Sequence, residues 1–218
     1  MLVRPRKIPK IFNLMKKVFY RGMARMLMAT AIGCGMLAAG GARTDAAEAQ
    51  AAVRKPSIRQ AKSPRDDAVF QRIRHFRAKL PEQYRKRNNF AWAAAKIEGL
   101  DKSEYFAHSG LQDLEGLSTA AADQIRSISL RPDRTTARFK VRCVNQRGQV
   151  DGPDCWERDV DTEYKILEGM AARLPDPSAA GSVQLYTDLR PCPSCWGVMQ
   201  QFLARYSNVH MQVLYRID

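Results

Sequence analysis

Two short motifs in the C-terminal half contain the residue types that a catalytic zinc site requires. Asp161 and Glu163 are separated by one residue at the start of a helix pattern, and Cys192 and Cys195 belong to a Pro-Cys-Pro-Ser-Cys segment that starts a second one. Two thiolates and a carboxylate are zinc ligands, and a catalytic zinc keeps its fourth position for water. We therefore predict a zinc ion held by Asp161, Cys192 and Cys195, with Glu163 moving protons to and from that water.

The segments that must position these motifs alternate between helix and strand. Apolar residues recur at helical or strand spacing in four consecutive segments, over residues 161–174, 181–187, 195–206 and 209–215. Helix N-termini carry partial positive charge and unpaired N–H groups, which stabilise thiolates. We expect the N-termini of the two helices to point at the same spot, where the metal would lie.

Further elements are expected upstream of these segments. We predict a basic amphipathic helix over residues 67–87, a hairpin with strands at 89–99 and 105–108, a helix around 120–125 and a strand over 137–144. Strands and helices joined by short connections favour an α/β sandwich about a mixed sheet.

The positive charge of the chain lies almost entirely in its N-terminal part. Residues 1–88 contain 21 lysines and arginines against 5 acidic residues, whereas residues 89–218 contain 15 against 17. The overall composition, 45% hydrophobic and 27% charged, is typical of a globular protein. The basic helix over 67–87 either packs its apolar stripe on the domain or contacts nucleic-acid phosphates.

The first fifty residues have the pattern of a targeting segment. Lysines and arginines precede a small, apolar run over residues 26–39, and Ala47-Glu48-Ala49 provides a small-x-small cleavage pattern. A membrane anchor and a disordered tail are the alternatives. We therefore divide the chain into an export signal or membrane-targeting segment over 1–49, a linker over 50–66 and a catalytic domain over 67–218.

Other interpretations of the same residues stay open at this point. Asp161 could serve only as a helix N-cap, with Glu163 as a partner of the helix dipole. Cys192 and Cys195 could form a thioredoxin-like dithiol, although only 23 residues follow Cys195. Residues 54–87 could be a basic, non-catalytic module that binds nucleic acid or an anionic surface.

The remaining cysteines do not decide between these interpretations. Five cysteines are too few for a disulfide scaffold in a chain of 218 residues. Cys143 and Cys155 either pair in an oxidising compartment or remain buried thiols.

The two motifs resemble the cytidine-deaminase-like superfamily, and within it the nucleic-acid deaminase domains of bacterial polymorphic toxins. That family carries His, Cys or Asp, then any residue and Glu, followed some tens of residues later by Pro-Cys-x-x-Cys. The resemblance covers roughly residues 66–218 and includes the hairpin over 89–110 and the segment 161–168. It implies a three-layer α-β-α sandwich around a mixed sheet of about five strands.

The resemblance also implies a reaction and its participants. Zinc held by the three predicted ligands would activate water, and Glu163 would act as acid and base in converting a nucleobase amine to a carbonyl. We expect cytosine to become uracil in DNA or RNA, with Asn89, His108 and Trp196 contacting the substrate. A secreted toxin of this kind would have a cognate immunity protein as partner, no organic cofactor, and contact with membranes only through its N-terminal segment.

One residue departs from the commonest form of the family motif. The first ligand in the superfamily is usually His, whereas this chain has Asp161. A carboxylate beside two thiolates gives the zinc site a net charge of −1, so the bound water should be less acidic than in a His/Cys/Cys site.

Overall fold

The computed structural model describes residues 54–217. The predicted export signal over 1–49 and the first residues of the predicted linker lie outside the described residues. Between residues 54 and 217 no helix has both the length and the apolar character needed to cross a membrane.

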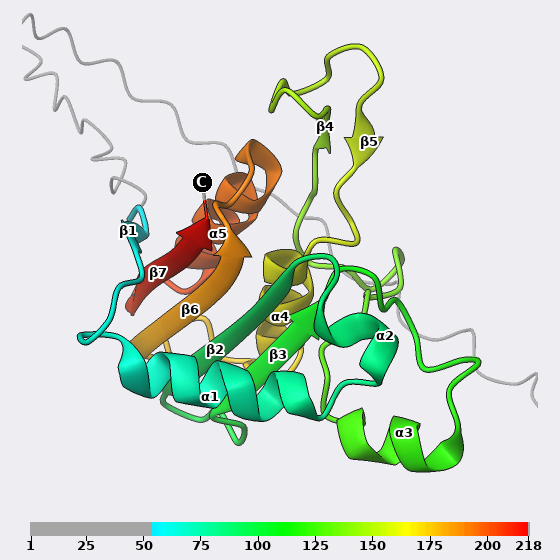
Figure 1. Ribbon diagram of the computed structural model, residues 1–218. Coiled ribbons are helices and arrows are strands. Elements are labelled where there is room, and N and C mark those ends of the chain that lie inside the picture. The colour runs from blue at the N-terminus through cyan, green and yellow to red at the C-terminus, as the bar shows by residue number, and fades with distance from the viewer. Residues whose placement is uncertain (1–53, 218) are drawn as a thin grey trace, which may run out of the picture. The chain divides into compact units, whose positions relative to one another are not determined.

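A mixed sheet of five strands forms the centre of the described domain (Figure 1). β6 and β7 are parallel neighbours, β1 adds in parallel to the outer edge of β7, and β2 pairs antiparallel with both β6 and β3. In sheet order the strands are β1 (Ser57–Gln60), β7 (Val209–Ile217), β6 (Gly181–Leu189), β2 (Phe90–Ile97) and β3 (Glu104–His108).

Helices cover both faces of this sheet, so the domain has three layers. The helices are α1 (Asp67–Ala78), α2 (Glu82–Arg85), α3 (Thr119–Ile125), α4 (Thr162–Ala171) and α5 (Pro193–Arg205). In Figure 1, α1 runs across the front of the sheet, while α4 and α5 lie behind it. The predicted α-β-α sandwich around a mixed sheet is confirmed.

The central strand β2 shows how the sequence builds the two cores. Successive side chains of a strand point to opposite faces of a sheet. Ala91 and Ala93 face α4 and α5, whereas Phe90 and Trp92 belong to the core beneath α1. Small residues on one face thus let the two site-bearing helices approach the sheet closely.

The strand predicted over 137–144 is wrong for all but its last residues, Cys143–Val144, which form β4. The backbone N–H groups of this segment do not pair with a neighbouring strand. The N–H groups of residues 138, 139, 140 and 142 donate instead to side chains of the helices behind the sheet, at 2.6 to 2.8 Å from oxygens of Glu168, Ser194 and Gln201. The alternating side chains resemble those of a strand, so the sequence alone suggested one. In the structure, side chains of helices α4 and α5 supply the hydrogen-bond acceptors that a neighbouring strand would supply in a sheet.

The helix predicted over 67–87 is also interrupted. α1 ends at Ala78, and a separate short helix, α2, begins after Pro81. Proline has no N–H to donate, and it disfavours helical backbone at the residue before it. Within α1 the apolar stripe, including Ile73 and Phe76, is buried against the sheet.

The linker prediction is wrong for residues 57–60, which form the edge strand β1. This strand takes its stability from backbone pairing with β7 rather than from an apolar pattern. Arg59 also donates two hydrogen bonds of 2.7 Å to the buried carboxylate of Asp66, which anchors the segment to the start of α1.

A disulfide bond joins Cys143 to Cys155, next to the strand pair β4 and β5 (Trp156–Glu157). Among the described residues, Cys192 and Cys195 are the free cysteines. The disulfide and the predicted zinc ligands therefore use different cysteines.

A fully buried lysine ties α4 to the end of β3. Lys165 Nζ donates to the carbonyl oxygens of His108 at 2.9 Å and Leu111 at 2.7 Å. Burial, with a smaller contribution from the positive charge of Arg131, lowers the pKa of Lys165 to about 7. This residue fixes α4, and hence its N-terminus, against the sheet.

The lowered pKa predicts a pH-dependent contribution of Lys165 to stability. Between pH 7 and the unfolded-state pKa, the unfolded chain binds more protons than the folded chain, so the unfolding free energy rises with pH. Relative to Lys165→Met, the wild type should gain about 2 kcal/mol of unfolding free energy between pH 7 and pH 9. Urea denaturation of both proteins at the two pH values measures this; an equal difference at both would contradict the assignment.

Candidate metal centre and active site

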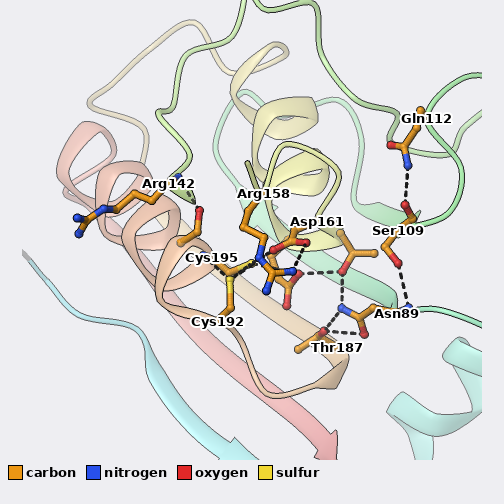
Figure 2. Close-up of polar contacts among 12 residues, drawn as sticks. Asn89, Ser109, Gln112, Arg142, Arg158, Asp161, Thr187, Cys192 and Cys195 are labelled. Carbon is orange, nitrogen blue, oxygen red and sulfur yellow. Dashed lines mark hydrogen bonds and ion pairs between the residues drawn. The ribbon is translucent and has the colours of Figure 1, made fainter. Parts of the chain in front are cut away.

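The structure brings Asp161, Cys192 and Cys195 together at the N-termini of α4 and α5 (Figure 2). The two sulfur atoms are 3.5 Å apart. Asp161 Oδ2 lies 3.4 Å from the sulfur of Cys192 and 3.1 Å from that of Cys195. Cys192 and Cys195 lie at the start of α5, and Asp161 lies at the start of α4. Together they place three ligand atoms around a common centre.

The donor atoms and their spacing fit a zinc ion. Zn–S bonds of about 2.3 Å and a Zn–O bond of about 2.0 Å in a tetrahedron place the ligand atoms roughly 3.5 to 3.8 Å apart. The observed separations of 3.1 to 3.5 Å lie close to that range. Two thiolates and one carboxylate leave the fourth tetrahedral position for water.

Asp161 does not act as a helix cap through its side chain. It occupies the N-cap position of α4, but its carboxylate makes no capping hydrogen bond there. Cys192, by contrast, is the N-cap of α5 and accepts a hydrogen bond from the backbone N–H of Cys195. The Asp161 carboxylate faces the sulfur pair instead, which is the arrangement expected of a ligand.

The electrostatics of the cysteine pair also favour a bound cation. Contact with the Cys195 sulfur lowers the pKa of Cys192, while the same contact and burial raise the pKa of Cys195. The carboxylates of Asp161 and Glu163 raise the pKa of Cys195 further. One thiolate therefore forms readily in this pair, and the second requires a positive charge beside it.

The same surroundings count against the thioredoxin-like interpretation. Dithiol chemistry uses a thiolate stabilised by positive surroundings. Here the buried thiol of Cys195 lies 3.1 Å from a carboxylate oxygen of Asp161 and 3.6 Å from one of Glu163. These two acidic groups raise the pKa of Cys195, so both sulfurs of the pair are ionised together only beside a cation.

Glu163 lies beside the ligand atoms in the first turn of α4. Its side chain is buried, and Oε2 is 3.6 Å from the Cys195 sulfur. Burial, and then repulsion from the Asp161 carboxylate, raises the pKa of Glu163. A carboxyl group that holds a proton more readily than usual suits an acid and base that shuttles protons near neutral pH.

A hydrogen-bond network fixes the orientation of the Glu163 carboxylate. Thr162 Oγ1 donates to Glu163 Oε2 at 2.8 Å, and Asn89 Nδ2 donates to Thr162 Oγ1 at 2.9 Å. The Asn89 amide also donates to Thr187 Oγ1 and accepts from the backbone N–H of Leu189. Asn89 is therefore occupied by protein groups here, and its predicted contact with substrate stays a prediction.

Thr162 and Thr187 were not among the site residues predicted from the sequence. Thr162 is the middle residue of the Asp-x-Glu motif, which permits any residue there, and Thr187 lies near the end of β6. Their positions in the sequence could have identified them, because Thr162 begins α4 and Thr187 lies near the end of β6, next to the predicted site.

We predict that Thr162→Val reduces kcat by about tenfold while leaving the zinc content unchanged. Valine removes the hydroxyl that donates to the Glu163 carboxylate, and a hydrogen bond to a charged group is worth about 1.5 to 3 kcal/mol. Thr162→Ser keeps the hydroxyl and should retain most of the activity. Equal activity of the valine and serine variants would show that this hydrogen bond does not matter.

The two aromatic residues that were predicted to contact the substrate, His108 and Trp196, have different environments in the structure. The His108 ring is fully buried; its Nε2 lies 2.8 Å from the Arg87 carbonyl oxygen, and its Nδ1 accepts from the Gly110 N–H. Burial lowers the pKa of His108, which favours the neutral ring that these two contacts require. Both ring nitrogens are thus engaged by backbone groups.

Trp196 has a different environment. It is half-buried in the first turn of α5, next to Cys195, and packs partly against the core behind the sheet. It also lines an open hollow of about 520 Å³ together with Ile58, Arg190, Pro191 and Pro193. Its indole therefore borders this hollow, whereas contact with a substrate stays a prediction.

Comparison with known proteins connects this site to a family. Residues 73–216 match the toxin-deaminase family model, described as the BURPS668_1122 family of deaminases. The match includes the three candidate ligands, Glu163 and the five-stranded sheet except for β1. No solved structure matches the chain.

Proposed function

Since this chain belongs to the BURPS668_1122 family of toxin deaminases, we propose that it is a zinc-dependent hydrolase that converts cytosine to uracil in DNA or RNA. The observation that supports the proposal best is the convergence of Asp161, Cys192 and Cys195 on one point with Glu163 beside them. A single acidic residue next to a three-ligand site is the arrangement that hydrolytic deamination requires.

Each residue of the site has a role in the proposed reaction. Asp161, Cys192 and Cys195 would hold the ion, which supplies a Lewis acid that makes water acidic near neutral pH. Glu163 takes the proton from the attacking water and delivers it to the departing amine, so that ammonia leaves. Thr162 and Asn89 keep the carboxylate of Glu163 pointed toward the ligand atoms.

The substrate and the biological setting are also part of the proposal. We infer a nucleobase within nucleic acid, approached from the side of Trp196, whose half-exposed indole can stack on a base. Export through residues 1–49 and a cognate immunity protein agree with membership of a toxin family. The catalytic domain then begins at β1 rather than at residue 67, because β1 completes the sheet.

The direct test is to incubate the purified full-length chain with cytosine-containing oligonucleotides. Single-stranded DNA, double-stranded DNA, RNA and free cytidine are compared, and uracil is measured by mass spectrometry. We expect uracil in at least one polymer, and its loss after zinc is removed with a chelator. A zinc-loaded protein that forms no uracil in any polymer would contradict the proposal.

A further inference from the structure

The predicted zinc site contains more negative charge than the metal can neutralise. Two thiolates and one carboxylate contribute three negative charges against the two positive charges of zinc. The ligand residues are buried or half-buried, and an uncompensated charge in such a place is costly. A cation near Asp161 would offset this excess negative charge, which a neutral histidine in that position would not add.

Arg158 is the cation that the structure places beside this ligand. Its Nη1 lies 3.9 Å from Asp161 Oδ1, and both side chains are largely buried, with 18% and 14% exposed (Figure 2). The two oxygens of the carboxylate face different groups, since Oδ2 lies 3.1 to 3.4 Å from the sulfur atoms of Cys192 and Cys195. One oxygen is thus turned to the metal position while the other faces the guanidinium.

The position of Arg158 is set by the chain that surrounds it. Its backbone N–H donates to the Arg142 carbonyl oxygen, its own carbonyl accepts from the Asp161 N–H, and its guanidinium carbon lies 4.2 Å from the centre of the Trp156 ring. The Nε atom is buried and has no hydrogen-bond partner in the part of the chain described. Stacking on Trp156 thus holds the guanidinium toward Asp161.

The acidic neighbours of Arg158 in sequence are already paired with other arginines. Arg134 lies 2.6 Å from Glu157 and 3.3 Å from Asp159, and Arg131 lies 3.6 Å from Asp159. Among the ion pairs of residues 54–217, the pair that involves Asp161 is the one with Arg158. Arg158 is therefore left to pair with the candidate ligand Asp161.

We propose that Arg158 is a positioning residue of the metal site. It orients the Asp161 carboxylate so that Oδ2 faces the two sulfur atoms, and its charge offsets the excess negative charge of an Asp/Cys/Cys site. Groups that hold a metal-ligating side chain commonly affect metal affinity by about 10- to 100-fold. The inference rests on the proposed zinc site and extends it to a residue that no ligand motif contains.

The test measures zinc affinity rather than activity. The full-length protein is stripped of metal and titrated with zinc in competition with a chromophoric chelator. Arg158→Gln should weaken zinc binding by about 10- to 100-fold, and Arg158→Lys should recover part of that loss because it restores the charge. Arg147→Gln is the matched control, since Arg147 is exposed in the loop between β4 and β5, and it should bind zinc like the wild type.

A second background separates this role from general damage to the fold. In Asp161→His the first ligand is neutral, so adding Arg158→Gln should change zinc affinity by less than about threefold. If Arg158→Gln lowered zinc affinity equally in the wild-type and Asp161→His backgrounds, the proposal would be overturned. Unchanged zinc affinity in Arg158→Gln would overturn it as well. A higher KM for nucleic acid with unchanged zinc affinity would also overturn it, by assigning Arg158 to substrate phosphates. Failure of the wild type to bind zinc would instead refute the site itself.

Discussion

Glu163→Gln is expected to reduce uracil formation by about a thousandfold or more while the protein keeps its fold and its zinc. Glutamine has nearly the same shape and can still accept the hydrogen bond from Thr162, but it cannot take or return a proton. General acid and base catalysis by one positioned group accounts for about 10²- to 10⁴-fold in rate. Rates on the best oligonucleotide substrate, with zinc content determined on the same samples, measure the effect.

A carboxylate elsewhere on the same helix provides the control for this experiment. Glu168 is buried on α4 like Glu163, but its Oε1 accepts the backbone N–H groups of Arg138 and Phe139. Glu168→Gln retains an acceptor oxygen, so it should alter stability more than catalysis. A Glu163→Gln protein as active as Glu168→Gln would remove Glu163 from the mechanism.

Cys195→Ser is expected to lower zinc affinity by more than about a hundredfold and to abolish deamination with it. Cys195 is buried, and its sulfur is the ligand atom nearest to Asp161 Oδ2. Serine offers a hydroxyl that is a far poorer zinc ligand than a thiolate. Because the metal would bind the folded state, zinc should also raise the melting temperature of the wild type and leave that of the variant unchanged.

The disulfide supplies a matched control for the loss of sulfur. Replacing both Cys143 and Cys155 with Ser removes two sulfur atoms that lie outside the ligand set. That protein should lose stability, typically about 2 to 4 kcal/mol, but should still bind one zinc. If zinc affinity fell as far in this variant as in Cys195→Ser, the assignment of the ligands would be wrong.

The sequence was sufficient to predict the elements whose patterns are local. The hairpin of β2 and β3, the helices α4 and α5, and the strands β6 and β7 each have their own apolar spacing. The candidate ligands Asp161, Cys192 and Cys195 could be selected because they lie at helix starts, and α4 and α5 pack in one core behind the parallel strands β6 and β7.

The features that the sequence did not reveal depend on contacts between distant segments. β1 is a short polar segment that becomes a strand only through its pairing with β7. The residues before β4 alternate like a strand, yet their N–H groups find acceptors on α4 and α5. Arg158 has no motif of its own, and its relation to Asp161 follows from the turn that joins β5 to α4.

Arg158 also offers a reason why the site tolerates Asp161 where histidine is commoner. The aspartate adds a negative charge, and the arginine three residues before it offsets that charge, so the three ligands, a bound zinc and Arg158 together carry no net charge. We therefore expect Asp161→His to preserve zinc binding and to make the zinc affinity independent of Arg158.

Zinc K-edge X-ray absorption of the purified full-length protein tests the central claim most directly, because it reports the atoms around the metal. We expect one zinc per chain, with two sulfur atoms at about 2.3 Å and the remaining ligands oxygen at about 2.0 to 2.2 Å. A protein that binds no zinc, or a zinc surrounded by four sulfur atoms or by none, would contradict it.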